Sequence, residues 1–232
     1  MHPYFDMKNI LVFCVSIFIT ITLNAQMNEI GPFIGGSNYI GDVGSTTYIN
    51  PKDLSLGVIY KLNLSSRFAA RATFTHVKFS ADNANAASPR KKSIPYKFNN
   101  SLNEIALGLE FNFFKYNLNQ FKFMHSPYVF ITFAYTNYSA SKYQTGSLFN
   151  KTARVANLSF PFGIGYKIKL MHRFGMSIET RINYTGKDNL EGDQFFINKL
   201  NFNNPNNKDW IVTTGVSFVY AFGKRTCYFN DF

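Results

Sequence analysis

The sequence predicts an all-β fold, an eight-stranded antiparallel up-and-down transmembrane β-barrel with short periplasmic turns and long extracellular loops. Aromatic residues make up 18% of the 232 residues and charged residues only 16%, a composition that argues against intrinsic disorder. The mean hydropathy of −0.12 argues against a helical membrane protein, which needs several apolar runs of about 18 residues. The third observation is a strict alternation of apolar and polar residues that recurs to the end of the chain.

The first segment, residues 1–25, predicts a secretory signal peptide with Met7 as its natural start. Lys8 supplies a positive charge, residues 10–23 form an apolar stretch, and Asn24-Ala25 offers a small-residue cleavage site. A transmembrane anchor is the alternative, but the apolar stretch is too short to span a bilayer. We expect the barrel to occupy residues 26–223 and a short basic periplasmic tail to occupy residues 224–232.

Alternating segments of about 10 to 14 residues predict the strands. They are expected at residues 28–37, 54–64, 67–79, 102–114, 127–138, 156–169, 173–185 and 210–222. In the segment 173–185, for example, Phe174 and Ile178 fall on one face and Glu179 and Arg181 on the other. A tilted membrane-spanning strand needs about 9–11 residues, whereas strands of globular proteins are nearer 5–6. Strand length therefore favours a membrane barrel.

The predicted connections alternate in length. Ser65-Ser66 and Met171-His172 are tight turns, and residues 115–126 make a connection of intermediate length. The long polar connections are residues 38–53, 80–101, 139–155 and 186–209. Short turns at one end and long loops at the other are typical of an outer-membrane barrel, and an even number of strands places both termini in the periplasm.

The apolar face of each strand is expected to contact lipid. Lipid offers no partner to a free backbone N–H or C=O, so the sheet must close on itself. Aromatic residues near the strand ends suit the interfacial girdles. They are Tyr60, Tyr128, Tyr138, Tyr166, Tyr184, Trp210 and Tyr220. The alternative is a soluble barrel or sandwich, in which the large apolar residues would turn inward.

One position does not suit a strand. Pro161 lies inside the segment 156–169 and removes a hydrogen-bond donor from the ladder. Because Gly163 and Gly165 follow it, we expect a β-bulge at this point.

The polar face predicts the contents of the barrel, because eight strands leave room for side chains only. Six inward-facing charged residues are expected to form a lumen charge network: Lys61, Arg71, Glu110, Lys167, Glu179 and Arg181. Opposite charges in one confined lumen will pair, since an unpaired buried ion costs several kcal/mol. We expect the network to centre on Glu110, Glu179, Arg71 and Arg181. Two roles are open: a polar plug that fixes the barrel shape, or a path for protons or ions.

Several function classes lack the residues that they need. Beyond the signal peptide only Cys227 remains as a cysteine, and His76, His125 and His172 lack the spacing of metal ligands. There is no P-loop and no G-x-S-x-G motif, so we expect no cofactor, no metal and no small-molecule substrate. The net charge of +11 does not indicate nucleic acid, because an exported protein meets lipid and glycan first. A lipid-modifying barrel enzyme is less favoured, because the pair His125-Ser126 has no acidic partner nearby.

The order of several motifs resembles the PorG family, outer-membrane barrel components of the type IX secretion system. The first motif is residues 29–42 (EIGPFIGGSNYIGD). Further matches are Glu104 with LEFNFF at residues 109–114, PYVF at 127–130, FPFGIG at 160–165 and DW at 209–210. The residues that carry the match are Glu29, Gly31, Gly35, Asn38, Tyr39, Gly41, Asp42, Pro161, Gly163, Asp209 and Trp210.

The resemblance implies a role that the residue patterns alone do not. It implies a non-enzymatic barrel that anchors or positions a periplasmic ring, which a PorK-type lipoprotein and a PorN-type protein form. A general structural or adhesion barrel acting through its extracellular loops is the alternative. Outer-membrane lipid and lipopolysaccharide are further expected partners. The cluster Arg90-Lys91-Lys92 is expected to contact lipopolysaccharide phosphates, or else to be a solvated loop.

Basic residues collect at the end of the short turns. They are Arg67, Lys115, Lys122, Arg173, Lys224 and Arg225, with Asp231 as the only nearby acidic residue. This candidate periplasmic rim could dock an acidic partner surface, because Coulomb attraction speeds and orients the encounter. The alternative is a rim that contacts phospholipid headgroups.

Overall fold

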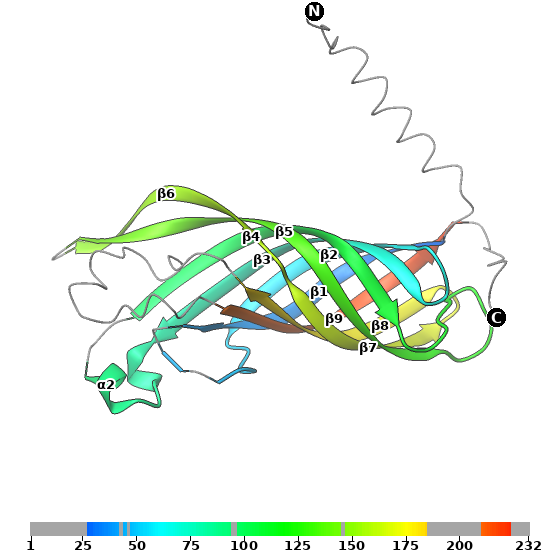
Figure 1. The fold of residues 1–232 in the computed structure, drawn as a ribbon, viewed down its shortest axis with the longest axis horizontal. Coiled ribbons are helices and arrows are strands. Elements are labelled where there is room, and N and C mark those ends of the chain that lie inside the picture. Colours follow the sequence, from blue (N-terminus) through cyan, green and yellow to red (C-terminus); the bar gives the residue numbers. More distant parts are fainter. Residues whose placement is uncertain are drawn as a thin grey trace, which may run out of the picture.

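Nine strands form one antiparallel sheet that closes into a barrel (Figure 1). The computed structural model describes residues 27–41, 44–45, 47–93, 97–144, 147–184 and 210–223. The strands are β1 (Met27–Ile40), β2 (Asp53–Asn63), β3 (Phe68–Asp82), β4 (Lys97–Asn112), β5 (His125–Gln144), β6 (Ser147–Ser159), β7 (Phe162–Met171), β8 (Phe174–Tyr184) and β9 (Trp210–Phe222). Two short helical turns, η1 (Asn83–Asn85) and α2 (Pro89–Lys92), connect β3 to β4. Over the described residues, no helix is both long enough and apolar enough to cross a membrane.

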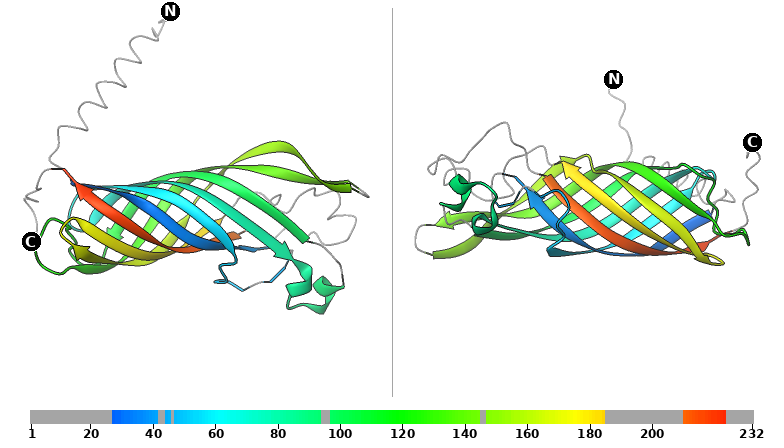
Figure 2. Two further views of the ribbon diagram at one scale, coloured as in Figure 1. Left: turned by 180° about the vertical axis from the view of Figure 1, so that it is seen from behind. Right: turned by 90° about the horizontal axis from the view of Figure 1, so that it is seen from below.

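The ring has eight strand positions, as predicted. Consecutive strands pair around the barrel, and β1 pairs with β9 to close it. β6 and β7 share one position, because both pair with β5, β6 along its outer half and β7 along the half that begins at His125. The fold is therefore an up-and-down antiparallel barrel, with strands that slant around its axis (Figure 2).

The bulge predicted at Pro161 is wrong. Ile131 pairs with Phe162 in β7 and Ala134 pairs with Ser159 in β6, so the register continues across the gap with no inserted residue. The backbone N–H of Thr132 still donates to the Pro161 carbonyl at 2.8 Å. The ladder lacks only the backbone N–H that proline does not have. This loss divides one barrel strand into the two segments β6 and β7.

A belt of apolar side chains covers the outside of the barrel. Among the most exposed are Ile34, Phe74, Ile105, Leu107, Leu109, Ile131, Leu158, Phe160, Ile164 and Ile178. Large apolar residues that point outward all around a closed ring exclude the soluble-barrel alternative, which would bury them. The belt and the absence of a sheet edge define a transmembrane β-barrel.

Two of the predicted girdle residues are wrongly placed. Tyr60, Tyr166 and Tyr220 are 38–44% exposed on the outer face. Tyr128 and Tyr138, however, are buried inside the barrel. Their strand alternates so that its odd-numbered residues, such as Val129 and Ile131, face lipid, and even-numbered tyrosines must then face the lumen.

The two ends of the barrel differ. At the turn end lie Met27, Phe222 and the connections 64–67, 113–124 and 172–173. At the other, the loop end, the hairpins β3–β4 and β5–β6 continue beyond the neighbouring strands (Figure 1). The long loop predicted at residues 139–155 is therefore wrong in its structure, because β5 runs to Gln144 and β6 begins at Ser147. Likewise, the strands β3 and β4 extend well into the loop predicted at residues 80–101.

Candidate functional site

The middle of the lumen contains a cluster of buried charges around Glu110. The Nζ of Lys167 donates to Glu110 Oε1 at 2.5 Å, and the Nζ of Lys61 lies 2.9 Å from Oε2. Arg71 contributes a third contact at 3.4 Å. These side chains are at most 3% exposed, so one carboxylate binds three cations out of contact with water. Removal of one member of such a cluster would leave a buried charge without its counter-charge, which is strongly destabilising.

Arg71 joins this cluster to a second carboxylate on the opposite side of the ring. Its Nη2 donates to Glu179 Oε1 at 2.9 Å and to Oε2 at 3.1 Å. The Tyr128 hydroxyl donates to Glu179 Oε2 at 2.7 Å. The guanidinium also lies over the ring of Phe130, 3.8 Å from its centroid. Five strands, β2, β3, β4, β7 and β8, are thereby linked through charges, and β5 through the phenol.

Arg181, the sixth residue of the predicted network, forms its ion pair elsewhere. Its Nη1 lies 3.1 Å from Oε1 of Glu104, and the Asn183 amide donates to Oε2 of the same carboxylate. Sequence reasoning assigned Glu104 to the family pattern and not to the charge network. Its signal was the alternation of β4, which places Glu104 and Glu110 on the same face.

Glycines make room for the large lumen side chains. A Cβ on Gly165 would lie 2.5 Å from the Tyr128 ring, and one on Gly163 would lie 2.6 Å from Phe130. Both contacts are shorter than any Cβ tolerates, so Gly163 and Gly165 permit two aromatic rings to fill the lumen.

Apolar layers lie above and below the charges. At the loop end the layer consists of Tyr39, Val77, Phe79, Ala81, Phe98, Leu102, Tyr138 and Ile211. At the turn end it consists of Met27, Ile59, Tyr116, Leu118, Val219 and Ala221. Hydropathy alone predicts these residues on the lipid face, because it places charged residues in the lumen and apolar residues outside. The alternation of β3, with Arg71 facing inward, places Val77, Phe79 and Ala81 on the lumen face as well. The paired charges between two apolar layers favour a plug over an ion path.

The layer at the turn end is completed by a connection and not by a strand. Residues 113–124 fold across the mouth of the barrel and insert Tyr116 and Leu118, which are 2% and 0% exposed. The Tyr116 N–H donates to the Ser66 carbonyl at 3.0 Å, and the Arg173 N–H donates to the Leu118 carbonyl at 3.2 Å. Burial, together with the carboxylates Glu29 and Glu110, raises the pKa of Tyr116, so the phenol stays neutral.

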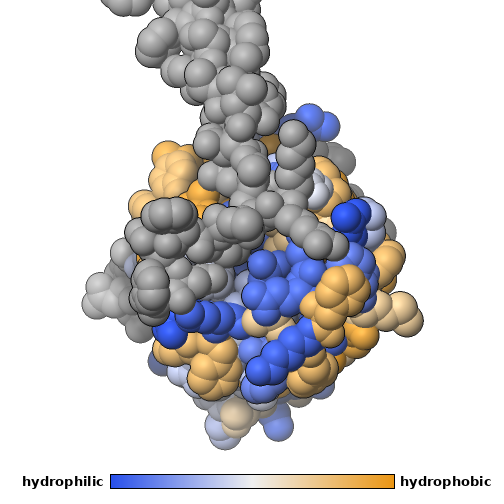
Figure 3. All heavy atoms as spheres, turned by 90° about the vertical axis from the view of Figure 1, so that its right-hand side faces the viewer, coloured by the Kyte–Doolittle hydropathy of each residue, from blue (hydrophilic) through white to orange (hydrophobic). Residues whose placement is uncertain are grey.

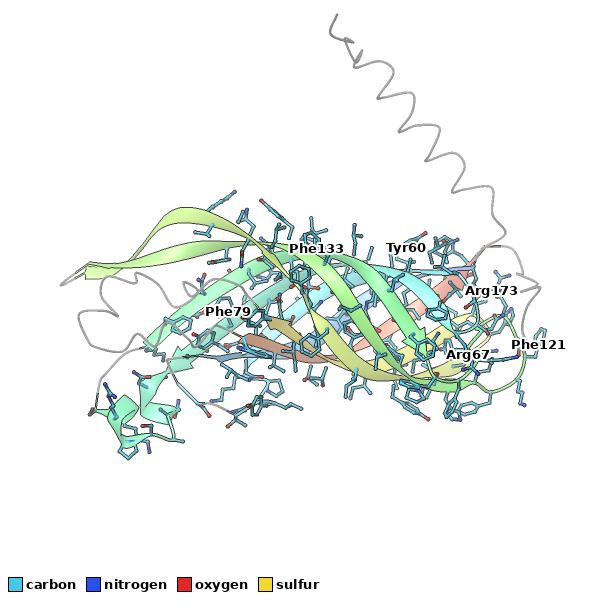
Figure 4. All side chains as sticks on the ribbon, viewed as in Figure 1. Tyr60, Arg67, Phe79, Phe121, Phe133 and Arg173 are labelled. Carbon is cyan, nitrogen blue, oxygen red and sulfur yellow. The ribbon has the colours of Figure 1, made fainter. Side chains whose placement is uncertain are left out.

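The candidate rim lies at this same end. Arg67, Lys115 and Lys122 are exposed and Arg173 is half-buried, whereas Lys224 and Arg225 lie outside the described residues. Arg67 and Arg173 are close to the mouth in Figure 4. Viewed onto this end, hydrophilic side chains lie among apolar ones (Figure 3). The described carboxylates lie elsewhere: Glu29, Glu104, Glu110 and Glu179 inside the barrel, and Asp53 and Asp82 at the loop end.

The residues considered for catalysis have other contacts. His125 Nδ1 lies 2.6 Å from the Tyr166 hydroxyl, and the Ser126 hydroxyl donates to the Pro127 carbonyl at 2.7 Å. His76 Nδ1 lies 2.8 Å from Asn103 Oδ1 on the outer face. Among the described residues, no group of three His, Cys, Asp or Glu side chains could hold a metal ion.

The family-motif residues occupy structural positions. Glu29 accepts from Asn63 at 2.8 Å inside the barrel, and Asn38 donates from its amide to the carbonyls of Thr47 and Tyr48 at 3.0 and 3.2 Å. Tyr39 belongs to the apolar layer at the loop end, Gly163 makes room for the Phe130 ring, and the carbonyl of Pro161 accepts from the Thr132 N–H. Gly31 and Gly35 approach the β9 backbone, and the ring of Trp210 packs against Tyr184. Gly41 follows β1, while Asp42 and Asp209 lie outside the described residues.

The closed ring, the apolar belt and the filled lumen define a β-barrel of the outer-membrane type. The chain belongs to the family described as "Domain of unknown function (DUF6089)", whose model matches residues 8–231. No curated protein sequence matches it.

Solved structures of outer-membrane proteins have a similar fold. Ail, the attachment invasion locus protein of Yersinia pestis, in complex with the heparin analogue sucrose octasulfate, is 10% identical with a TM-score of 0.48, over 86% of this chain and 100% of Ail. The N-terminal β-barrel domain of Pseudomonas aeruginosa OprF is 13% identical with a TM-score of 0.42, over 84% and 97%. Neisserial surface protein A is 12% identical with a TM-score of 0.44, over 83% and 94%.

Proposed function

We propose that this chain is a non-enzymatic outer-membrane barrel that anchors or positions the periplasmic PorK/PorN-type ring of a type IX secretion machine. The observation that carries the proposal is the turn end, where Arg67, Lys115, Lys122 and Arg173 surround a closed mouth and no described carboxylate is exposed. A barrel whose lumen is filled acts through its surfaces. The type IX assignment itself is supported by the resemblance of the ordered motifs to the PorG family.

In this orientation the turn end lies in the periplasm and the loop end outside the cell. Exposed cations raise the rate at which an acidic surface is met and orient it, while the barrel holds the contact at the membrane. Such attraction weakens as salt is added, because exposed charges are screened over about 8 Å at physiological ionic strength.

The experiment is a mild-detergent pull-down from outer membranes through a tag after Phe232, read by mass spectrometry. We expect recovery of the PorK-type and PorN-type proteins, and a loss of at least tenfold in the variant Arg67→Glu with Lys122→Glu. The matched control is Lys97→Glu, which reverses a 73% exposed side chain at the loop end. Recovery of the barrel alone, from membranes in which the ring is intact, would reject the secretion role.

A second candidate is a structural or adhesion barrel that acts through its loop end. The observation in its favour is that the hairpins β3–β4 and β5–β6 extend past the neighbouring strands (Figure 1). A deletion of residues 81–97 would cut into both strands and remove Ala81 from the apolar layer at the loop end. Deleting residues 84–92 alone should abolish adhesion and leave the ring contact unchanged if this candidate is correct.

A further inference from the structure

The connection 113–124 has a buried half and an exposed half. Tyr116 and Leu118 fill the mouth, while Phe121 and Phe123 are 82% and 67% exposed. Burial of a phenylalanine side chain is favourable, so two phenylalanines exposed to water could contribute to the affinity for a partner that buries them.

The exposed half does not hang loosely from the barrel. The Lys169 N–H donates to the Met124 carbonyl at 2.8 Å, directly after Phe123, and the Asn119 N–H donates to Asn117 Oδ1 at 2.9 Å, two residues before Phe121. The Phe121 ring stacks on His172 of the β7–β8 turn, with centroids 5.0 Å apart and planes at 7°. Two connections thus hold the Phe121 ring, and the Phe123 ring lies 5.8 Å from the ring of His125, so a partner would lose little entropy in ordering these side chains.

The position of Phe121 separates it from the lipid belt. Figure 4 shows Phe121 at the extreme turn end, beyond Arg67 and Arg173, whereas Tyr60 and Phe133 lie along the side of the barrel. A bilayer surrounds the sides of a barrel and leaves its ends in water. Phe121 therefore faces the aqueous compartment at the turn end.

The surface is also cationic. Lys122 is exposed between the two phenylalanines, and Arg67 is exposed on the neighbouring turn. A concave hollow of ≈ 410 Å³ lies beside Phe123, lined in part by Lys115, Lys122 and His125. Aromatic residues are enriched at the centres of protein interfaces, and the rims of such interfaces are polar.

We propose that Phe121, Phe123 and His172 form an aromatic anchor, which inserts into an apolar pocket with acidic borders on a soluble periplasmic protein. The inference rests on the proposed function, because it takes that protein to be a component of the ring. Charge complementarity selects the acidic border, since Lys122 and Arg67 would face it. The aromatic rings supply affinity, and the cations supply orientation and rate.

The test compares Phe121→Ala/Phe123→Ala with a matched pair from the lipid belt, Phe133→Ala/Phe160→Ala. Phe133 and Phe160 are 48% and 58% exposed, and their rings also contact each other, 5.4 Å apart. Tagged barrels are purified from outer membranes in mild detergent, and the co-purified ring proteins are quantified against the barrel. Relative to wild type, we expect the amount of ring protein recovered per barrel to fall at least tenfold for the anchor variant. For the belt variant it should fall less than twofold.

The outcomes separate the inference from the proposed function. Ring proteins recovered equally by wild type and by the anchor variant would overturn the aromatic anchor and leave the proposed function in place. No ring proteins with wild type would overturn both. A third readout is the fraction of each barrel extracted from membranes by alkaline carbonate: an anchor variant that is extracted more readily while it keeps the ring would show that the surface contacts lipid, which also overturns the inference.

Discussion

Glu110 is the residue on which the lumen charges depend. It binds Lys61, Lys167 and Arg71 at 2.5–3.4 Å with no exposure to water. We expect Glu110→Gln to lower the free energy of unfolding by about 3–5 kcal/mol, because it leaves buried cations without their counter-charge. The measurement is urea unfolding of the barrel in lipid vesicles, followed by the fluorescence of Trp210.

The control for this change is Asp82→Asn at the loop end. Asp82 lies 4.0 Å from Lys97, and the Lys97 side chain is 73% exposed, so the loss should stay within about 1 kcal/mol. An equal loss for the two variants would contradict a structural role for the Glu110 cluster.

At this scale the sequence predicted which residues face inward but not which of them meet. Alternation places Lys61, Arg71 and Glu110 on the lumen face because the period of a strand is two. It carries no information on the slant of the strands around the ring, which brings Arg71 of β3 to Glu179 of β8. Tyr128 was misplaced for a different reason. Tyrosine is common in interfacial girdles, but the alternation of β5 points Tyr128 into the lumen.

Among the elements, the connection 113–124 combines structural and surface roles. Leu118 is fully buried in the layer at the turn end, whereas Phe121, three residues later, is 82% exposed. We expect Leu118→Ala to cost about 2–5 kcal/mol through the lost burial and the cavity left behind. Phe121→Ala should change stability by less than about 0.5 kcal/mol, typical of surface positions. Urea unfolding in vesicles measures both, and similar losses would contradict the division of this connection into two halves.

The strands were predictable only where a membrane imposes a pattern. Inside the belt, lipid on one face and a polar lumen on the other force the alternation that marks β2, β4 and β8. Toward the loop end the sequence of β5 becomes Tyr138-Ser139-Ala140-Ser141-Lys142, which predicts a loop and not a strand. The outer half of the β5–β6 hairpin was missed because its pairing leaves no mark on hydropathy.

For the whole molecule, three stacked layers fill the barrel: an apolar layer, the charges, and a second apolar layer. An eight-stranded barrel has an interior that side chains can fill completely. We therefore expect the purified protein to insert into planar lipid bilayers without conducting ions, measured as single-channel current at 100 mV in 1 M KCl. Regular conductance steps with the wild-type protein would contradict the filled lumen. Their disappearance when Phe79 and Phe98 are changed to tryptophan would show that the ions pass through the barrel.

The lumen charges also affect how the barrel assembles in the membrane. Lys61 and Arg71 lie on adjacent strands, β2 and β3, and their counter-charges arrive with β4 and β8. A half-assembled sheet would bring lumen charges to the membrane without all of their partners, at a cost that lipid does not compensate. Each incomplete sheet would then be less stable than the closed ring by its unmatched charges. Assembly becomes cooperative: insertion is favourable for the complete ring and unfavourable for its fragments.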